Sequence, residues 1–379
     1  MKNRNYELEG TIAILQLSKS IVFLSFLTII CSLLFLFFIF FPPNNLLVLK
    51  NGGEKETNND HALSSLNLSG TQPNHGTISN SMVNEEKTDE KLWSAPDSLN
   101  IPQGELGKMV RYGKELVMHT SKYWGPKGSI DHISNGMNCQ NCHLEAGTRP
   151  FGNNFAVFFN SYPKIILRSG NLSPASQRIV ECMERSLGGK SPDTNKKEVK
   201  AILAYMAWIG KDVPRGKKIK GSGSEKLPYL DKPANIDLGK IVYGAKCQRC
   251  HGIQGQGLLS SSGREYTSPP VWGEHSFNDG AGMYRISNLA GFIKNNMPFG
   301  ATYKSPLLSN EEAWNVAAYI ASKERPHYNQ DKDWKVLRNK PIDLPFGPYL
   351  DPFPESQHKF GPFKPIIAYL EKKYPILKP

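Results

Sequence analysis

Two copies of the motif Cys-x-x-Cys-His are the most chemically specific feature of the sequence. Each supplies two thiols and, directly after the second thiol, an imidazole: Cys139, Cys142 and His143 in the first copy, and Cys247, Cys250 and His251 in the second. Thiols at this spacing can each form a thioether to a haem vinyl group, and the adjacent imidazole then reaches the iron as proximal ligand. A redox Cys-x-x-Cys needs no following histidine, and a zinc site would leave both histidines idle. The sequence therefore predicts two covalently bound haem c groups.

The candidate for the sixth ligand of the second haem iron is Met297. It lies in the segment Asn296-Met297-Pro298, after His251 and ahead of the last predicted helix of its region. A methionine thioether is a typical sixth ligand that raises the reduction potential. Two alternatives stay open: Met283 could bind the iron instead, and Met297 could simply fill a gap in the core.

The first motif is followed by no Met-Pro pair, so the candidate ligand for its iron is a cysteine. A helix is expected to begin with Ser173 as its N-cap and Pro174 at its first position. Arg178, Cys182 and Ser186 then lie four residues apart along one stripe of that helix. Arg178, one turn from Cys182, favours the thiolate, which is the form that binds iron and attacks sulfur.

The residues of this helix also have less specific interpretations. A lone cysteine such as Cys182 is usually an inert, buried thiol. Arg185 is expected to be solvated, and Met183 and Met206 are expected to belong to the core. Spacing alone therefore leaves the role of Cys182 open.

The motifs are embedded in a repeated pattern of helices. Apolar residues recur at helical spacing before each motif and again in a helix that closes each copy. Helices are expected over residues 103–123, from residue 238 onward, over 198–210 and over 310–322. Ser309 followed by Glu312 predicts a capping box at the start of the last helix.

This repeat predicts a mainly α fold with two tandem class I cytochrome c-like domains. We expect the first domain over residues 98–213 and the second over 229–326, joined by a polar Gly/Ser linker over 214–228.

The C-terminal tail, residues 327–379, is rich in proline and aromatic residues. It is expected to lie extended over the two domains before a short helix near residues 366–373. His358 within the tail is expected to be structural rather than an iron ligand.

An apolar segment over residues 21–41 carries no charge and predicts a single transmembrane helix. At about 1.5 Å per residue, a helix of this length spans about 31 Å of hydrocarbon. Basic residues precede it in 1–20, and no small-x-small cleavage pattern follows, which favours an uncleaved anchor over a removed signal peptide. We expect residues 1–20 in the cytoplasm, the anchor in the inner membrane, and a flexible tether over 42–97 that holds the soluble head in the periplasm.

Composition excludes two broad classes of protein. The 379 residues include 46 Lys and Arg against 34 Asp and Glu, but no basic block is dense enough for a nucleic-acid-binding arm. Gly 33 and Pro 27 are too few for a low-complexity chain, and 39% apolar residues can fill real cores. We therefore expect neither a nucleic-acid partner nor disorder as the main state.

Four segments between residues 98 and 326 resemble the dihaem thiosulfate dehydrogenases that form tetrathionate. They read NCHLEAG from residue 141, YPKIILRSG from residue 162, RIVECMERSLGG from residue 178 and AYMAW from residue 204. The third segment contains an Arg-x3-Cys-x3-Ser pattern that is unusual among cytochromes. The resemblance implies a catalytic first haem with His143 and Cys182 as its axial ligands.

The same resemblance implies roles for further residues. Arg168, Arg178 and Ser186 fall on the family's substrate-binding positions. A second haem, ligated by His251 and Met297, would pass electrons to an acceptor cytochrome or a terminal oxidase.

One position departs from the pattern of some family members. Those members have a lysine directly before the methionine ligand, where a ligand exchange occurs on reduction. This chain has Asn296 there, which argues against such an exchange.

The implied reaction suits these side chains. Two thiosulfate dianions must lose one electron each while a sulfur–sulfur bond forms between like charges. Arginines offset that repulsion and can bind sulfonate oxygens through two N–H groups, and Cys182 could act as nucleophile or sulfur carrier. The reverse reaction would use the same groups. The less specific role of Arg168 and Arg178 is solvation or pairing with haem propionates.

Two other classes of function stay open. A membrane-anchored dihaem electron-transfer cytochrome with no substrate of its own would need both haems but would have no use for the Arg-Cys-Ser stripe. A dihaem peroxidase needs an open iron site, which ligation by Cys182 would block. The sequence therefore favours the thiosulfate-oxidising enzyme over both.

Overall fold

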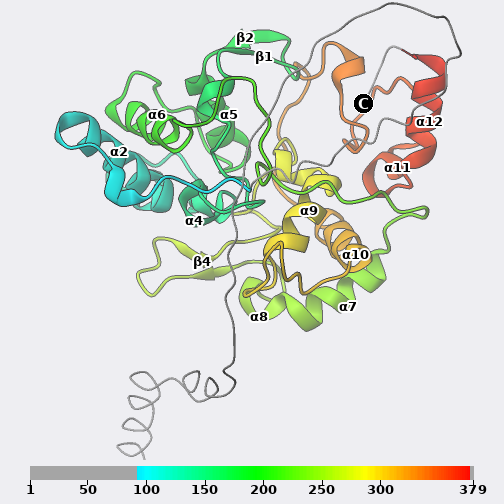
Figure 1. Ribbon diagram of the computed structural model, residues 1–379. Helices are drawn as coiled ribbons and strands as arrows, with labels where there is room; N and C mark the ends of the chain where they lie inside the picture. Colours follow the sequence, from blue (N-terminus) through cyan, green and yellow to red (C-terminus); the bar gives the residue numbers. More distant parts are fainter. Residues whose placement is uncertain (1–91, 376–379) are drawn as a thin grey trace, which may run out of the picture. The chain divides into compact units, whose positions relative to one another are not determined.

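The computed structural model describes residues 92–375 (Figure 1). The predicted anchor over 21–41, the segment 1–20 and most of the predicted tether lie outside the described residues. Within residues 92–375, no helix combines the length and apolar character needed to span a bilayer. The described chain begins inside the range predicted as tether, where Trp93 packs against the first core and donates its N–H to the carbonyl of Lys220 at 3.2 Å.

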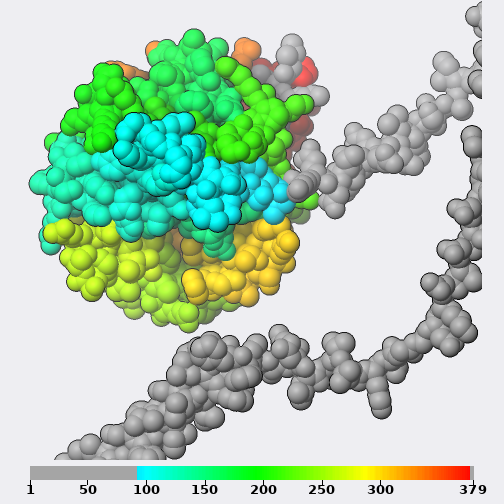
Figure 2. Space-filling view, turned by 60° about the vertical axis from the view of Figure 1, so that its left-hand side comes forward, coloured from blue at the N-terminus to red at the C-terminus, as the bar shows by residue number. Residues whose placement is uncertain are grey.

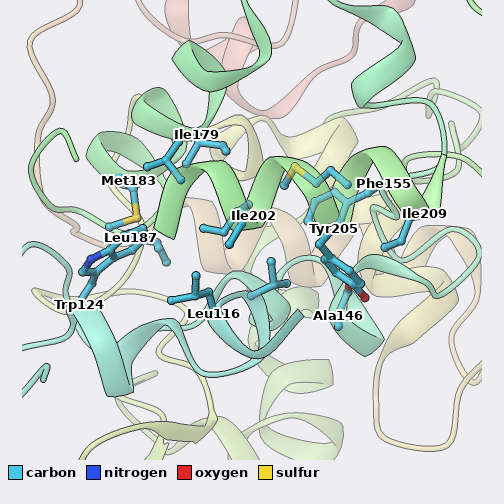
Figure 3. Close-up of a cluster of buried hydrophobic side chains, with 14 of the residues drawn as sticks. Leu116, Trp124, Ala146, Phe155, Ile179, Met183, Leu187, Ile202, Tyr205 and Ile209 are labelled. Carbon is cyan, nitrogen blue, oxygen red and sulfur yellow. The ribbon is translucent and has the colours of Figure 1, made fainter. Parts of the chain in front are cut away.

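The first group of helices surrounds the first motif. Its members are α2 (Gly104–Met118), α3 (Thr120–Trp124), α4 (Leu144–Gly147), α5 (Ala175–Arg185) and α6 (Lys197–Ile209). Leu116 from α2 and Ile202 from α6 are fully buried against each other's helix, and α5 adds Met183 to the same core (Figure 3). The predicted core positions of Met183 and Met206 are confirmed.

The second group of helices repeats this order around the second motif. Its members are α7 (Ile236–Lys246), α8 (Gln248–His251), α9 (Ile286–Asn296) and α10 (Asn310–Ala321). The predicted capping box is confirmed: Ser309 Oγ accepts from the Glu312 N–H at 3.0 Å, and a Glu312 carboxylate oxygen accepts from the Ser309 N–H at 2.8 Å. The described residues of both groups belong to one contact unit, in which the groups pack directly on each other (Figure 2).

A glycine at the centre of each main helix pair reveals the repeat in three dimensions. A Cβ at Gly113 of α2 would meet the carbonyl oxygen of Ala201 in α6 at 1.9 Å, and a Cβ at Gly239 of α7 would meet that of Asn315 in α10 at 1.9 Å. Only glycine permits so close a backbone approach. The two copies therefore use the same crossing contact, as the sequence repeat predicts.

Short irregular elements connect these helices. The strands form two antiparallel hairpins, β1 (Lys164–Ile166) with β2 (Asn171–Ser173) and β3 (Leu258–Leu259) with β4 (Tyr266–Ser268). The 3-10 turns are η2 (Ser98–Asn100), η3 (Cys139–Asn141), η4 (Phe159–Ser161), η5 (Gly282–Tyr284) and η6 (Leu337–Asn339). The loop of the β3–β4 hairpin bonds to the segment that leads into the first motif, and the turn between β1 and β2 lies beside α5, so both hairpins help to position the candidate site.

The C-terminal tail runs over both groups of helices and ends in α11 (Glu355–Phe360) and α12 (Lys364–Lys373). The short helix expected near 366–373 is confirmed as α12, whereas α11 was not predicted. Ile366 is fully buried in the second core. His358 is buried, its Nδ1 donates to the carbonyl of Ile342 at 2.6 Å, and its ring stacks on Tyr349, which supports the structural role expected for it.

Asp343 of the tail supports a stability prediction. Its fully buried carboxylate accepts from Arg285 at 2.6 Å and from the backbone N–H of Ser287 at 3.1 Å. Asp343→Ala is expected to lower the free energy of unfolding by about 3 kcal/mol, because it leaves buried donors without their acceptor. Urea denaturation should show this loss, while Asp331→Ala, at an exposed position of the same tail, should change stability by less than about 0.5 kcal/mol. If Asp343→Ala and Asp331→Ala were equally stable, the buried bonds of Asp343 would not stabilise the fold as expected.

Candidate active site

The first motif is carried by η3 and the start of α4, and its histidine is held by a backbone carbonyl. His143 Nδ1 lies 2.5 Å from the oxygen of Asn153, to which it must donate because a carbonyl only accepts. The other ring nitrogen, Nε2, therefore keeps the lone pair that could bind a metal. Burial lowers the pKa of His143 to about 4, so the imidazole is neutral.

His251 in α8 repeats this arrangement in the second motif. Its Nδ1 donates to the carbonyl oxygen of Pro269 at 2.8 Å, and burial lowers its pKa. Within residues 92–375, no cysteine of either motif forms a disulfide. Each motif thus offers two thiols and a neutral imidazole oriented by a carbonyl, a donor set that fits the proximal side of a covalently attached haem.

Helix α5 positions the Arg-Cys-Ser stripe, but it starts one residue later than predicted. Pro174, not Ser173, is the N-cap, and it provides no side-chain cap. The prediction of Ser173 as N-cap is wrong because Ser173 belongs to strand β2, where it pairs with Lys164. Ser186 ends the helix as its C-cap, and its N–H donates to the carbonyl of Cys182 at 2.9 Å.

The Cys182 thiol lies close enough to both thiols of the first motif to interact with them. Burial raises the pKa of Cys139 to about 11 and that of Cys142 to about 12, and the charge of a Cys182 thiolate adds to both shifts. That same thiolate charge is the largest cause of the raised pKa of Arg178. A sulfur that can become anionic, a fixed guanidinium and the first motif therefore meet in one place.

Glu181 joins the two arginines that the sequence singled out. Its Oε2 accepts from Arg178 Nη1 at 2.7 Å and lies 3.9 Å from Arg168 Nη1. Arg168 comes from the turn between β1 and β2, and burial lowers its pKa to about 10. The structure thus brings Arg168 beside α5. Within residues 92–375, no bond joins the Ser186 side chain to either arginine.

Sequence reasoning missed Glu181 and misplaced Arg185. The spacing of Glu181 three residues after Arg178 is the pattern of a helical ion pair and could have identified it. Arg185 was expected to be solvated, but it is buried and donates from Nη1 and Nη2 to the two carboxylate oxygens of Asp333 at 2.8 and 2.9 Å. The reason is that the C-terminal tail covers this end of α5. No local sequence pattern predicts the contact between Arg185 and Asp333, because the two residues are far apart in sequence.

Met297 follows α9 as its C-cap and is partly buried against the second core. The residue before it, Asn296, is buried and donates to the carbonyl of Phe151 at 3.1 Å. Met283 packs against both cores, and its sulfur lies 3.8 Å from Asn153 Nδ2. Asn296, next to Met297, is therefore bonded to the segment that contains Phe151 and Asn153. The same segment accepts the hydrogen bond from His143.

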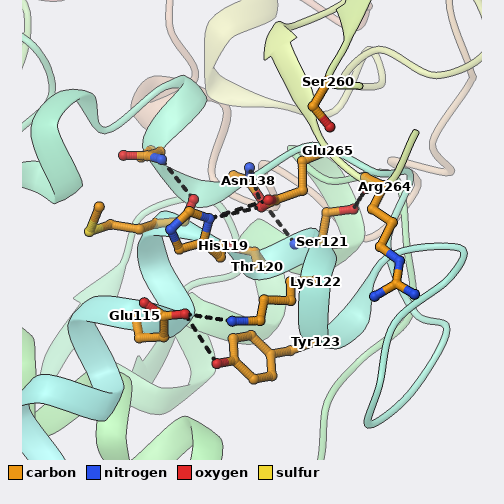
Figure 4. Close-up of polar contacts among 12 residues, drawn as sticks. Glu115, His119, Thr120, Ser121, Lys122, Tyr123, Asn138, Ser260, Arg264 and Glu265 are labelled. Atoms are coloured by element: carbon orange, nitrogen blue, oxygen red, sulfur yellow. Dashed lines mark hydrogen bonds and ion pairs between the residues drawn. The ribbon is translucent and has the colours of Figure 1, made fainter. Parts of the chain in front are cut away.

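The loop of the β3–β4 hairpin of the second copy docks beside Ser121 and Asn138 of the first (Figure 4). Glu265 accepts from Asn138 Nδ2 at 3.1 Å and lies 3.1 Å from His119 Nδ1. Ser121 Oγ donates to the carbonyl of Arg264 at 2.6 Å. These bonds fix the β3–β4 hairpin, which follows the second motif, to the segment that leads into the first motif.

Comparison with known proteins identifies the family to which this chain is similar. Residues 236–324 match the cytochrome c family model. A thiosulfate dehydrogenase from Psychrobacter arcticus is 39% identical over 244 residues, which cover 63% of this chain and 70% of that protein. The chain belongs to the thiosulfate dehydrogenase family. The family assignment confirms the resemblance seen in the sequence, and the protein is an enzyme with a mainly helical cytochrome c fold.

Two further members of the thiosulfate dehydrogenase family support the assignment. The enzyme from Stutzerimonas stutzeri is 34% identical over 62% of this chain and 74% of its own length. A solved structure, thiosulfate dehydrogenase (TsdBA) from Marichromatium purpuratum in its as-isolated form, has a TM-score of 0.57 and 32% identity over 62% of this chain. The present chain covers only 50% of that longer chain.

Proposed function

We propose that this protein oxidises two thiosulfate anions to one tetrathionate at the first motif and passes the electrons out through the second. The observation that carries the proposal is the meeting of Arg178, Cys182 and the thiols of Cys139 and Cys142. A fixed cation beside a sulfur nucleophile is what coupling two sulfur-containing dianions needs. The family membership supports thiosulfate as the substrate.

The proposed cofactors are two covalent haem c groups. Cys139, Cys142 and His143 would hold the first, with Cys182 as its sixth ligand. The second motif would hold the other, with Met297 as its sixth ligand, and Asn296 would not replace it because an amide is a poor iron ligand. When bound, the haems supply one-electron redox chemistry.

The side chains around Cys182 prepare the site for anions. Arg178 stays charged, since the neighbouring Cys182 sulfur and Glu181 raise its pKa. Arg168 presents a second guanidinium from the β1–β2 turn. Together they can bind sulfonate oxygens and offset the repulsion between two dianions while each loses one electron and the sulfur–sulfur bond forms. Ser186, at the end of the same helix, is the proposed hydroxyl partner of a substrate oxygen.

We also propose the cellular setting from the sequence. The apolar residues 21–41 would anchor the protein in the inner membrane, and the described residues would work in the periplasm. There they could deliver electrons to an acceptor cytochrome or a terminal oxidase.

Purified holoprotein tests this function. We expect two haems per chain by pyridine haemochrome and intact mass, and reduction of ferricyanide only when thiosulfate is present. An electron-transfer cytochrome with no substrate of its own would carry both haems but would give equal rates with and without thiosulfate. One haem per chain, or reduction independent of thiosulfate, would rule the proposal out.

A further inference from the structure

A strap from the C-terminal tail, residues 327–334, closes over the end of α5. Asp333 in this strap is buried, with 8% of its side chain exposed, and pairs with both oxygens to Arg185. The same carboxylate lies 3.7 Å from the Nε of Arg168. One tail residue therefore contacts the helix of Cys182 and the turn of Arg168 at once.

The strap also binds Arg168 through its backbone. The N–H of Trp334 donates to the Arg168 carbonyl at 2.6 Å, and the Arg168 guanidinium lies 5.7 Å from the Trp334 ring centre. Trp334 has φ of 56°, a left-handed conformation that a bulky residue rarely adopts. Such a conformation persists only where the surrounding contacts hold it. The strap is therefore fitted to Arg168.

The far end of the strap ties Arg185 to the second group of helices. Arg185 lies 4.1 Å from the Tyr328 ring centre and donates to the carbonyl of Gly280 at 3.4 Å. Its own carbonyl accepts from the N–H of Asn278 at 3.1 Å. Contacts on several sides therefore fix the position of the Arg185 guanidinium. Arg185 in turn fixes the position of the Asp333 carboxylate.

Among residues 92–375, several buried donors of this cluster and its strap have no hydrogen-bond partner: Arg168 Nη1, Arg185 Nε, Gln330 Nε2 and Trp334 Nε1. Of these, Arg168 Nη1 belongs to an arginine of the candidate site. Three arginines, Arg168, Arg178 and Arg185, face two carboxylates, Glu181 and Asp333. Within residues 92–375, the buried Nη1 of Arg168 makes no hydrogen bond, and it lies 3.9 Å from the Glu181 carboxylate. A buried donor of this kind requires a partner, and a sulfonate oxygen is a suitable one.

We propose that Asp333 is a positioning residue for anion binding: fixed by Arg185, it holds Arg168 so that Nη1 is directed at the incoming thiosulfate. The proposal rests on the proposed function, in which Arg168 binds substrate. The strap would then contribute to the active site although it lies far from both motifs in sequence.

Asp333→Asn and Arg185→Lys in the holoprotein test this role kinetically. Each removes the paired contact, and Arg185→Lys does so without changing charge. We expect KM for thiosulfate to rise about tenfold with kcat nearly unchanged, because uniform binding is lost. Asp331→Asn, two residues away and exposed, is the matched control and should stay within about twofold of the unchanged protein. If Asp333 merely balanced charge, Asp333→Asn would lower KM and Arg185→Lys would leave it unchanged, and either result would overturn the proposal.

A second measurement needs no turnover. Hydrogen exchange at the Trp334 amide should speed up at least about tenfold in Asp333→Asn and Arg185→Lys but not in Asp331→Asn. Calorimetric titration with sulfate, an unreactive dianion, should show weaker binding in the same two variants. If the unchanged protein does not oxidise thiosulfate, the proposed function fails while exchange and sulfate binding still decide the role of Asp333. If hydrogen exchange and sulfate affinity were both unchanged, the positioning role of Asp333 would be refuted. If Asp333→Asn does not fold, the results for Arg185→Lys alone decide whether Asp333 has this role.

Discussion

Cys182→Gly is expected to reduce thiosulfate oxidation about 10³-fold or more while both haems stay attached. The thioether cysteines and His143 are untouched, so haem attachment is preserved. A ligating or covalent group is lost, which costs far more than a binding contact. Initial rates with ferricyanide, haem content, and the low-spin thiolate signals of the oxidised protein would be measured together, and those signals should vanish.

Two control variants make this result specific to the sulfur. Glycine inside a helix costs about 1 kcal/mol relative to alanine, so Cys182→Ala separates loss of the thiol from loss of helix α5 and should be equally inactive. Met297→Gly should preserve the thiolate signals and disturb only the second haem. Full turnover with an unchanged spectrum in Cys182→Gly would make Cys182 a core thiol and favour an electron-transfer cytochrome.

The double variant Cys247→Ala/Cys250→Ala should lose one haem and steady-state turnover together. The second motif is the proposed exit for electrons, so ferricyanide reduction is expected to fall about 10²-fold or more. The first haem should still take up one electron from thiosulfate when the two are mixed without ferricyanide, so two chains are reduced for each tetrathionate formed, because Arg178 and Cys182 belong to the other group of helices. Intact mass and stopped-flow absorbance would record the two results.

The opposite double variant provides the matched control. Cys139→Ala/Cys142→Ala should also retain one haem, but thiosulfate should not reduce it. Unimpaired steady-state turnover in Cys247→Ala/Cys250→Ala would mean that the first haem delivers electrons directly and that the second is not required.

The local geometry of the candidate site could be predicted from sequence wherever it depends on spacing along the chain. The Cys-x-x-Cys-His motifs, the Arg178–Cys182 turn and the Ser309 capping box each involve residues within a few positions of one another, so their geometry follows from the local backbone. The helix repeat was predictable for the same reason.

Contacts between distant segments set the limits of that prediction. Arg185 was expected in solvent because nothing near it in sequence could bury its charge, and its partner Asp333 lies 148 residues away. Ser173 has the side chain of an N-cap, yet pairing with Lys164 commits its backbone to a strand. In both cases tertiary contacts overrode a reasonable local preference.

Product analysis during turnover measures most directly whether two thiosulfates are coupled at Cys182 and Arg178. The expected stoichiometry is two thiosulfates consumed and two ferricyanides reduced for each tetrathionate formed, as required when each thiosulfate loses one electron. Ion chromatography of timed samples, with absorbance at the ferricyanide band, provides all three quantities. Sulfite or sulfate as the main product, or more than two ferricyanides reduced for each pair of thiosulfates, would contradict tetrathionate formation at this site.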